Sequence, residues 1–135
     1  MTQKTLSVGI KGSHEQYVTE RMTAATVGSG LAQVFATPMM ITLAEKTCHD
    51  TVHPLLQPEE ATVGTRIDIS HLSPTPIGMT VRCECELVKV ENRHLTFSVS
   101  IYDEVELIGT GIHERHIVNA SRFQTKADNK RKQQI

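Results

Sequence analysis

Three side chains of the kinds used in acid–base and nucleophilic chemistry stand at well-defined positions in the sequence. Glu45 lies beside an apolar stripe in the middle of a predicted helix, where a carboxylate costs free energy unless it is paired or functional. His71 closes a predicted strand on the face that carries its isoleucines, and Thr37 precedes Pro38 where the helix begins. A carboxylate, an imidazole and a hydroxyl can together supply a base and a nucleophile. We therefore treat Thr37, Glu45 and His71 as candidate catalytic residues.

The stretch 34–52, VFATPMMITLAEKTCHDTV, predicts the central helix that positions two of these residues. Thr37 is a favourable N-cap and Pro38 suits the first helical position, whereas His53-Pro54 ends the pattern. One face repeats apolar or small residues at the spacing i, i+3, i+4, i+7, so it requires a surface to pack against. That face comprises Met40, Leu43, Ala44, Thr47 and Cys48.

From residue 62 onward the pattern changes to the two-residue alternation of β-strands. The inward face of the first strand is predicted to comprise Val63, Ile67, Ile69 and His71. Alternating stretches follow at 79–87 and 95–101, and a last strand spans about 105–118, in which Gly109 and Gly111 indicate a bend or a close approach of backbones. Short connections predict an antiparallel four-stranded meander, joined by at least one earlier strand. An α+β domain in which a curved sheet wraps one long helix is, at this length, the hotdog architecture.

Length, charge and composition exclude several classes of protein. A chain of 135 residues and 15.0 kDa forms one domain that can bury a core without metal or disulfides. With 14 basic and 15 acidic residues there is no extended basic field for nucleic acid or a membrane surface. No apolar run approaches the ~20 residues of a membrane span, and no signal peptide is evident, so we expect a cytoplasmic protein. We expect one domain over 1–125 and a polar, frayed tail over 126–135.

The cysteines and histidines do not predict a metal or redox site. Cys83 and Cys85 point to one face of a strand, and three cysteines are an odd number, so we interpret them as reduced core residues. The remaining histidines fall on a helix end and a separate strand without the spacing of a ligand cluster. These are His49, His53, His113 and His116. We expect no bound metal.

Three blocks of the sequence resemble one family of small hotdog proteins. VFATPMMITLAEKTC, VGTRIDISHLSPTPIGMTV and IGTGIHER are similar to the corresponding blocks of the fluoroacetyl-coenzyme A thioesterase family, and the similarity covers residues 33–118. The resemblance implies a hotdog fold and hydrolysis of a small acyl-coenzyme A (acyl-CoA). Coenzyme A (CoA) is then part of the substrate, and no separate cofactor is expected.

The resemblance also assigns roles to individual positions. Thr37, Glu45 and His71 match the family's catalytic threonine, glutamate and histidine. Three other positions fall near the acyl site: Gly64, whose backbone lines it, Arg115, and Phe35 of the F-A-T segment, which we group with the substrate-binding residues. Read from the residues alone, these positions have ordinary structural interpretations. Those are a helix cap for Thr37, a hydrogen-bonded core histidine for His71, a bulge for Gly64 and a solvated strand charge paired with Glu114 for Arg115.

The spacing of the candidate residues limits how they can meet. Thr37 and Glu45 are eight residues apart, about 12 Å along an ideal helix, so their side chains do not meet within it. Either Thr37 folds back from the cap, or a two-fold dimer brings Glu45 of one chain toward Thr37 of the other. The resemblance to hotdog proteins favours the second arrangement, because their active sites lie at a dimer interface. We expect a homodimer, with further pairing into a tetramer left open.

Two other functions remain open at the level of sequence. A non-catalytic acyl-CoA binding or sensing module would use the same fold without turnover. A hotdog hydratase or dehydratase is less favoured because no paired Asp and His form a hydratase-like motif. The acyl group and the choice between Thr37 and Glu45 as nucleophile also stay open. The family's fluoroacetate enzyme carries bulky aromatic residues in the lid before the helix, whereas residues 23–33 contain none.

Overall fold

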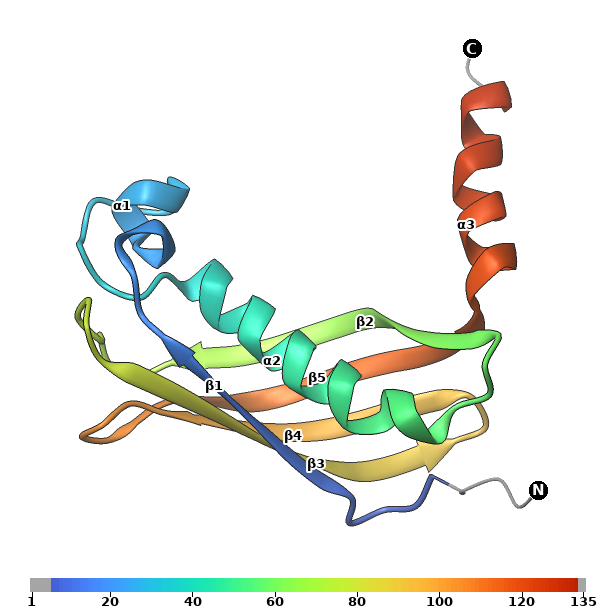
Figure 1. The fold of residues 1–135 in the computed structure, drawn as a ribbon, viewed down its shortest axis with the longest axis horizontal. Helices are drawn as coiled ribbons and strands as arrows, with labels where there is room; N and C mark the ends of the chain where they lie inside the picture. Colours follow the sequence, from blue (N-terminus) through green and yellow to red (C-terminus); the bar gives the residue numbers. More distant parts are fainter. Residues whose placement is uncertain (1–5, 134–135) are drawn as a thin grey trace.

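A computed structural model describes residues 6–133 and shows a curved antiparallel sheet lying around one long helix (Figure 1). The strands are β1 (Lys11–Tyr17), β2 (Glu60–His71), β3 (Thr80–Glu91), β4 (His94–Tyr102) and β5 (Leu107–Asn119). The helices are α1 (Ala24–Val27), α2 (Thr37–Val52) and α3 (Ala120–Asp128), with short 3-10 turns η1 (Glu20–Met22), η2 (His53–Leu55) and η3 (Asn129–Gln133). The predicted α+β hotdog fold is confirmed.

The order of strands in the sheet is β1-β3-β4-β5-β2, all antiparallel neighbours. Only β3, β4 and β5 form a meander, so the predicted four-stranded meander is wrong for β2. Residues 72–79, which carry two prolines, cross the end of the sheet and allow β2 to pair with β5 instead of β3. As a result β2 is an edge strand, and it lies beside α2.

The core lies between α2 and the concave face of the sheet. The buried residues of α2 are Met40, Leu43, Ala44, Thr47, Cys48 and Val52, which confirms the predicted face. The alternating residues of β3 and β4 are also buried as predicted: Val81, Cys83, Cys85, Leu87, Leu95, Phe97, Val99 and Ile101. The helix is therefore held with a fixed rotation over the sheet, and this rotation decides which of its polar residues face β2.

A β-bulge changes the inward face of β2. The register with β5 shifts between Gly64 and Arg66, so Thr65 is the extra residue. Before the bulge Thr62 is buried, and after it Ile67 and Ile69 pack against the core. The prediction that Val63 shares the face of the isoleucines is wrong because one extra residue inverts the alternation. Gly64 instead of Val63 faces the helix.

Two further features frame the site. A side chain at Gly111 would collide with the backbone of Asp68, so the predicted close approach of backbones at this glycine is confirmed.

At the opposite end of β5 the chain continues into α3, which projects from the sheet (Figure 1). The predicted domain boundary at residue 125 falls within α3, and the fraying of 126–135 stays a prediction. Among residues 6–133, no helix is both long and apolar enough to cross a membrane.

Candidate active site

Thr37 and His71 form a direct pair where α2 begins and β2 ends. The Thr37 Oγ1 and the His71 Nδ1 are 2.7 Å apart. Thr37 is exposed on the single chain, while His71 is half-buried. A neutral imidazole whose Nδ1 accepts the Thr37 hydroxyl proton has the geometry of a base beside a nucleophile.

The start of α2 explains why the Thr37 hydroxyl is available to His71. Ala36 is the N-cap, with no side-chain capping bond, and Thr37 is already helical with Pro38 beside it in the first turn. The prediction that Thr37 caps the helix is therefore wrong by one residue. Its side chain is turned toward β2, at the helix end where the partial positive charge of the macrodipole lies.

The other nitrogen of His71 has no partner. His71 Nε2 is buried and accepts or donates no hydrogen bond among residues 6–133. Burial lowers the pKa of His71 below its ordinary 6.5, which favours the neutral ring. If Nδ1 accepts from Thr37, then Nε2 carries the proton, and an unpaired buried donor is expensive unless a further group uses it. The buried Nε2 therefore retains a hydrogen-bonding capacity that the described residues do not use.

A second polar cluster surrounds Arg115 on the inner face of β5. The guanidinium is buried, with the residue only 5% exposed. Its Nε donates to Thr62 Oγ1 at 2.8 Å, and its Nη2 donates to the Thr62 carbonyl at 3.0 Å. Its Nη1 lies 3.6 Å from Glu45 Oε2. The alternative that Arg115 is a solvated charge paired with Glu114 is wrong, because Glu114 lies on the outer face and pairs with His94 and Arg66.

His113 belongs to this cluster and was missed by the sequence analysis. It is 1% exposed; its Nδ1 is 2.8 Å from the Arg66 carbonyl, and its Nε2 is 3.1 Å from Arg115 Nη1. The neutral ring thus donates through Nδ1 and accepts through Nε2, and burial lowers the pKa of His113. The signal was present in the sequence, because His113 and Arg115 are two residues apart on one strand and so share a face.

Glu45 reaches from α2 over the backbone of β2. Its side chain is 45% exposed, which confirms the prediction that the carboxylate is partly removed from water. A β-carbon added at Gly64 would lie 2.6 Å from Glu45 Oε2, and 3.3 Å from His113 Cε1. A side chain at this position would displace the carboxylate from where it lies. The Arg115 Nη1 lies beside the same Oε2, 3.6 Å away, so the guanidinium and the Gly64 backbone approach one oxygen of the carboxylate.

The candidate residues therefore form two groups within one chain, separated along α2. One is Thr37 with His71, and the other is Glu45 with Gly64 and Arg115; the eight-residue spacing keeps them about 12 Å apart along the helix. Thr37 does not fold back toward Glu45. Phe35, two residues before Thr37, is 1% exposed in the core, and its expected role in substrate binding stays a prediction.

The three cysteines are free and buried in the core. Burial raises the pKa of Cys83 to about 11, while a hydrogen bond from Cys48 lowers the pKa of Cys85 to about 7. No group of three or more His, Cys, Asp or Glu side chains suited to a metal ion occurs within residues 6–133. The hydroxyl, imidazole and carboxylate are thus the reactive groups that the site offers.

A curved sheet around one long helix is the hotdog fold, and here a hydroxyl–imidazole pair and a carboxylate lie along its helix and edge strand. The model of the fluoroacetyl-CoA-specific thioesterase family matches residues 18–121. A fluoroacetyl-CoA thioesterase of Streptantibioticus cattleyicolor is 41% identical over 98 residues, which is 73% of this chain and 70% of that protein. The chain belongs to the fluoroacetyl-CoA-specific thioesterase family.

Solved structures agree with this assignment. A crystal structure of the fluoroacetyl-CoA thioesterase FlK matches with a TM-score of 0.90 and 34% identity over 94% of this chain and 98% of that one. A variant of FlK in complex with fluoroacetate and CoA matches with a TM-score of 0.83 and 35% identity, over 87% and 99% of the two chains. A Thermus thermophilus thioesterase superfamily member matches at 0.89 with 25% identity, covering 96% of each chain.

Proposed function

We propose that this protein hydrolyses a small acyl-CoA at a site built from two chains. The pair of Thr37 and His71, joined at 2.7 Å, is the observation that carries the proposal, because it places a base on a hydroxyl beside the carboxylate-bearing helix. Family membership supports the reaction class. Water is the co-reactant: the carbon–sulfur bond breaks, the acyl carbon gains the hydroxyl, and the sulfur takes the proton.

Each candidate residue has a distinct part in this reaction. Glu45 acts as the base or the carboxylate nucleophile, with Arg115 fixing its orientation. His71 holds and moves the proton through the contact between its Nδ1 and the Thr37 hydroxyl. Thr37 is a positioned hydroxyl or the nucleophile. The Gly64 backbone N–H and the positive end of α2 stabilise the developing oxyanion. No resident cofactor or metal takes part.

The edge strand β2 supplies a route to a two-chain site. Its outer edge has no neighbouring strand among the described residues, and open edges of this length pair readily with another chain. A second copy of β2 bound antiparallel about a two-fold axis at Asp68 keeps inward residues opposite inward residues. In that register His71 lies opposite the bulge at Gly64 and Thr65 of the partner subunit. The exposed Thr37 and half-exposed Glu45 would then be covered by the second chain.

A single cysteine tests this pairing. A residue on the two-fold axis faces its own copy, so Asp68→Cys should form an intermolecular disulfide under mild oxidation, seen as a dimer on non-reducing gels. Ser98→Cys, also exposed but on the central strand β4, is the matched control and should remain monomeric on the gel. Equal cross-linking of both variants would contradict pairing through β2.

The acyl group accepted by this site is predicted to be small, without a requirement for fluorine. The segment before α2 contains α1 and no aromatic residue from 23 to 33, and its Leu31 is 96% exposed. Aromatic side chains that could enclose a fluoromethyl group are therefore missing from this segment. We expect acetyl-CoA and similar short esters to be turned over at rates comparable to fluoroacetyl-CoA.

Release of free thiol from a panel of short and medium acyl-CoA esters tests the function. Wild type should hydrolyse at least one short ester, and both Glu45→Gln and His71→Ala should lose that activity while keeping a melting temperature close to wild type. If no ester is hydrolysed but several raise the melting temperature, the protein is a binding module and the hydrolase proposal fails.

A further inference from the structure

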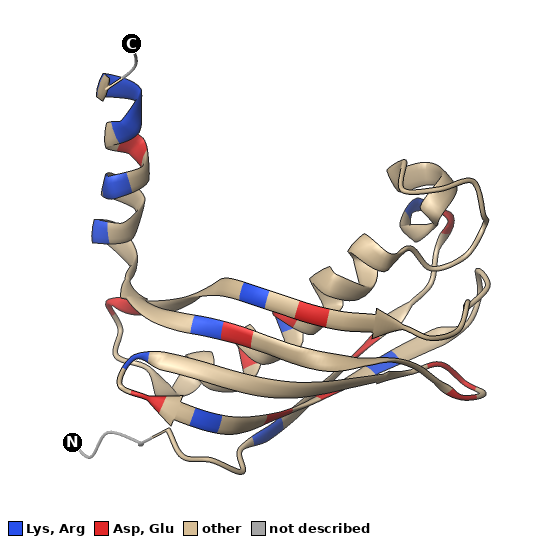
Figure 2. Ribbon diagram, turned by 180° about the vertical axis from the view of Figure 1, so that it is seen from behind, with Lys and Arg blue, Asp and Glu red and all other residues tan. Residues whose placement is uncertain are grey.

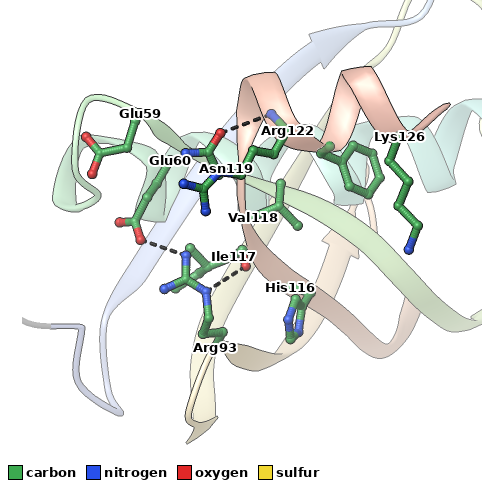
Figure 3. A pocket seen from close by; sticks show the side chains of 10 residues that line it. Glu59, Glu60, Arg93, His116, Ile117, Val118, Asn119, Arg122 and Lys126 are labelled. Carbon is green, nitrogen blue, oxygen red and sulfur yellow. Dashed lines mark hydrogen bonds and ion pairs between the residues drawn. The ribbon is translucent and has the colours of Figure 1, made fainter. Parts of the chain in front are cut away.

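A hollow of about 610 Å³ lies where β5 passes into α3 (Figure 3), and its lining includes none of the candidate catalytic residues. Its walls come from the start of β2, the end of β5, the β3–β4 turn and one face of α3. Its charged lining comprises Glu59, Glu60, Arg93, Arg122 and Lys126. Glu60 and Arg93 form an ion pair, so the two cations of α3 outweigh the one remaining carboxylate, Glu59 (Figure 2). This excess of positive charge on the α3 side favours an anionic ligand there.

The cations around the hollow differ in whether the fold already uses them. Arg93 is engaged: its Nη2 is 2.7 Å from Glu60 Oε2, and its Nε donates to the Ile117 carbonyl at 3.0 Å. Arg122 and Lys126 make no side-chain ion pair or hydrogen bond within residues 6–133. They lie four residues apart on one helical face, where two like charges repel each other and destabilise a helix. An external anion would remove this repulsion.

The same face of α3 carries an aromatic ring. Phe123, 45% exposed, lines the hollow between the two cations. The first turn of α3 also borders it, with Asn119 accepting the Arg122 backbone N–H at 3.0 Å and thereby capping the helix. Exposed aromatic rings stack on nucleobases, and arginine and lysine bind phosphate. The combination fits a ligand that carries both a flat base and phosphate groups.

We propose that this hollow binds a phosphorylated adenine nucleotide, with Arg122 and Lys126 on its phosphates and Phe123 on its base. The nucleotide has two possible sources, the nucleotide half of substrate CoA or a free nucleotide; the first rests on the proposed thioesterase function. Glu60, at the hollow, is four residues from Gly64 on β2, about 13 Å along the strand. The pantetheine arm of CoA can span that separation around the end of the sheet.

The test compares substrates with and without the nucleotide. We compare kcat/KM for an acyl-CoA with kcat/KM for the same acyl-pantetheine, which lacks the nucleotide. In the double variant Arg122→Ala/Lys126→Ala, the ratio of the first value to the second should fall about tenfold because KM for the CoA ester rises. Lys130→Ala/Lys132→Ala removes two charges further along the same tail and should keep the wild-type ratio. Adenosine 3′,5′-bisphosphate should raise the melting temperature of wild type and of this control, but not of the double variant.

The two measurements, the ratio of kcat/KM values and the thermal shift, distinguish the source of the nucleotide and show whether the proposal fails. If the bisphosphate inhibits acyl-CoA hydrolysis competitively and the double variant lowers the ratio of kcat/KM values, the nucleotide is that of substrate CoA. If the bisphosphate raises the melting temperature but neither of these effects occurs, the ligand is a free nucleotide. An unchanged ratio together with no thermal shift overturns the proposal, as does a double variant whose only change is a lower oligomeric mass. Absence of any thioester hydrolysis would remove the proposed function, while the thermal shift would still decide this inference.

Discussion

The two halves of the candidate site differ in how completely one chain builds them. Around Arg115, a buried guanidinium is held by Thr62, His113 and Glu45 through contacts that form when the chain folds. Around Thr37, one hydrogen bond to His71 stands at an exposed position, and a buried ring nitrogen lacks a partner. A single chain thus fixes the charged half of the site and leaves the hydroxyl–imidazole half open. This difference is what the proposed two-chain site accounts for.

Removing the charge of Glu45 should have the largest effect on activity. Glu45→Gln preserves size but abolishes a base or nucleophile, so we expect kcat/KM for the preferred acyl-CoA to fall by about 10² to 10⁴. The melting temperature should change little because the side chain is 45% exposed. Thiol release and a thermal melt on the same preparation measure both quantities. Near-normal turnover would place the chemistry elsewhere.

The Arg115 cluster should dominate stability. Arg115→Met leaves His113 without a donor and Glu45 without its cation, and we expect a loss of roughly 3 kcal/mol in the free energy of unfolding measured with urea. Arg82→Met is the control, because its guanidinium is 46% exposed, and it should cost less than about 1 kcal/mol. Similar losses for the two variants would mean that the Arg115 contacts contribute no special stability.

Thr37 should show the opposite balance between stability and activity. Because Ala36 is the N-cap, Thr37→Ala should cost less than the roughly 1 kcal/mol of a lost cap, while kcat/KM falls at least about tenfold. Thr37→Ser should retain much of the activity because the hydroxyl remains. Thr42→Ala, which removes another exposed hydroxyl of α2, should be neutral in the assay. A Thr37→Ala protein that is destabilised yet active would restore the simple capping role.

The smallest expected effect concerns protonation of His71. Burial lowers its pKa below 6.5, so the unfolded chain binds a proton at pH values where the folded ring does not. The stability that His71 contributes is therefore fully present above pH 6.5. It declines as the pH falls from 6.5 toward the lower pKa of the folded ring. An NMR titration of the ring should show a midpoint below 6.5. A midpoint above 6.5 would indicate a charged ring paired with an anion.

Sequence patterns predicted the parts of this fold that depend on regular periodicity. The buried face of α2 follows a helical repeat, and the inward faces of β3 and β4 alternate without interruption, so both were correct. The position of β2 was wrong because strand order depends on the path of residues 72–79, which local spacing does not encode. Val63 was misplaced because a single bulge residue inverts the alternation.

The candidate site was predicted less evenly. Glu45, His71 and Arg115 came from residue types combined with a family resemblance, and their assigned roles stay predictions. The two-residue spacing of His113 and Arg115 places them on one face of β5, but the hydrogen bond between them depends on side-chain rotamers, which that spacing does not fix. Thr37 is not the N-cap because the helix begins one residue earlier than its sequence signals indicate. Helix termini commonly differ from such signals by a residue.

Mixing two inactive variants tests the two-chain site most directly. Glu45→Gln and His71→Ala are each expected to be inactive alone. If a site takes Glu45 from one chain and His71 from the other, a mixed dimer contains one site with both residues intact. Subunit exchange at equal concentrations should then restore about one quarter of the wild-type activity, since half of the dimers are mixed and each has one working site. Exchange confirmed by mass spectrometry with no recovery of activity would contradict the two-chain site.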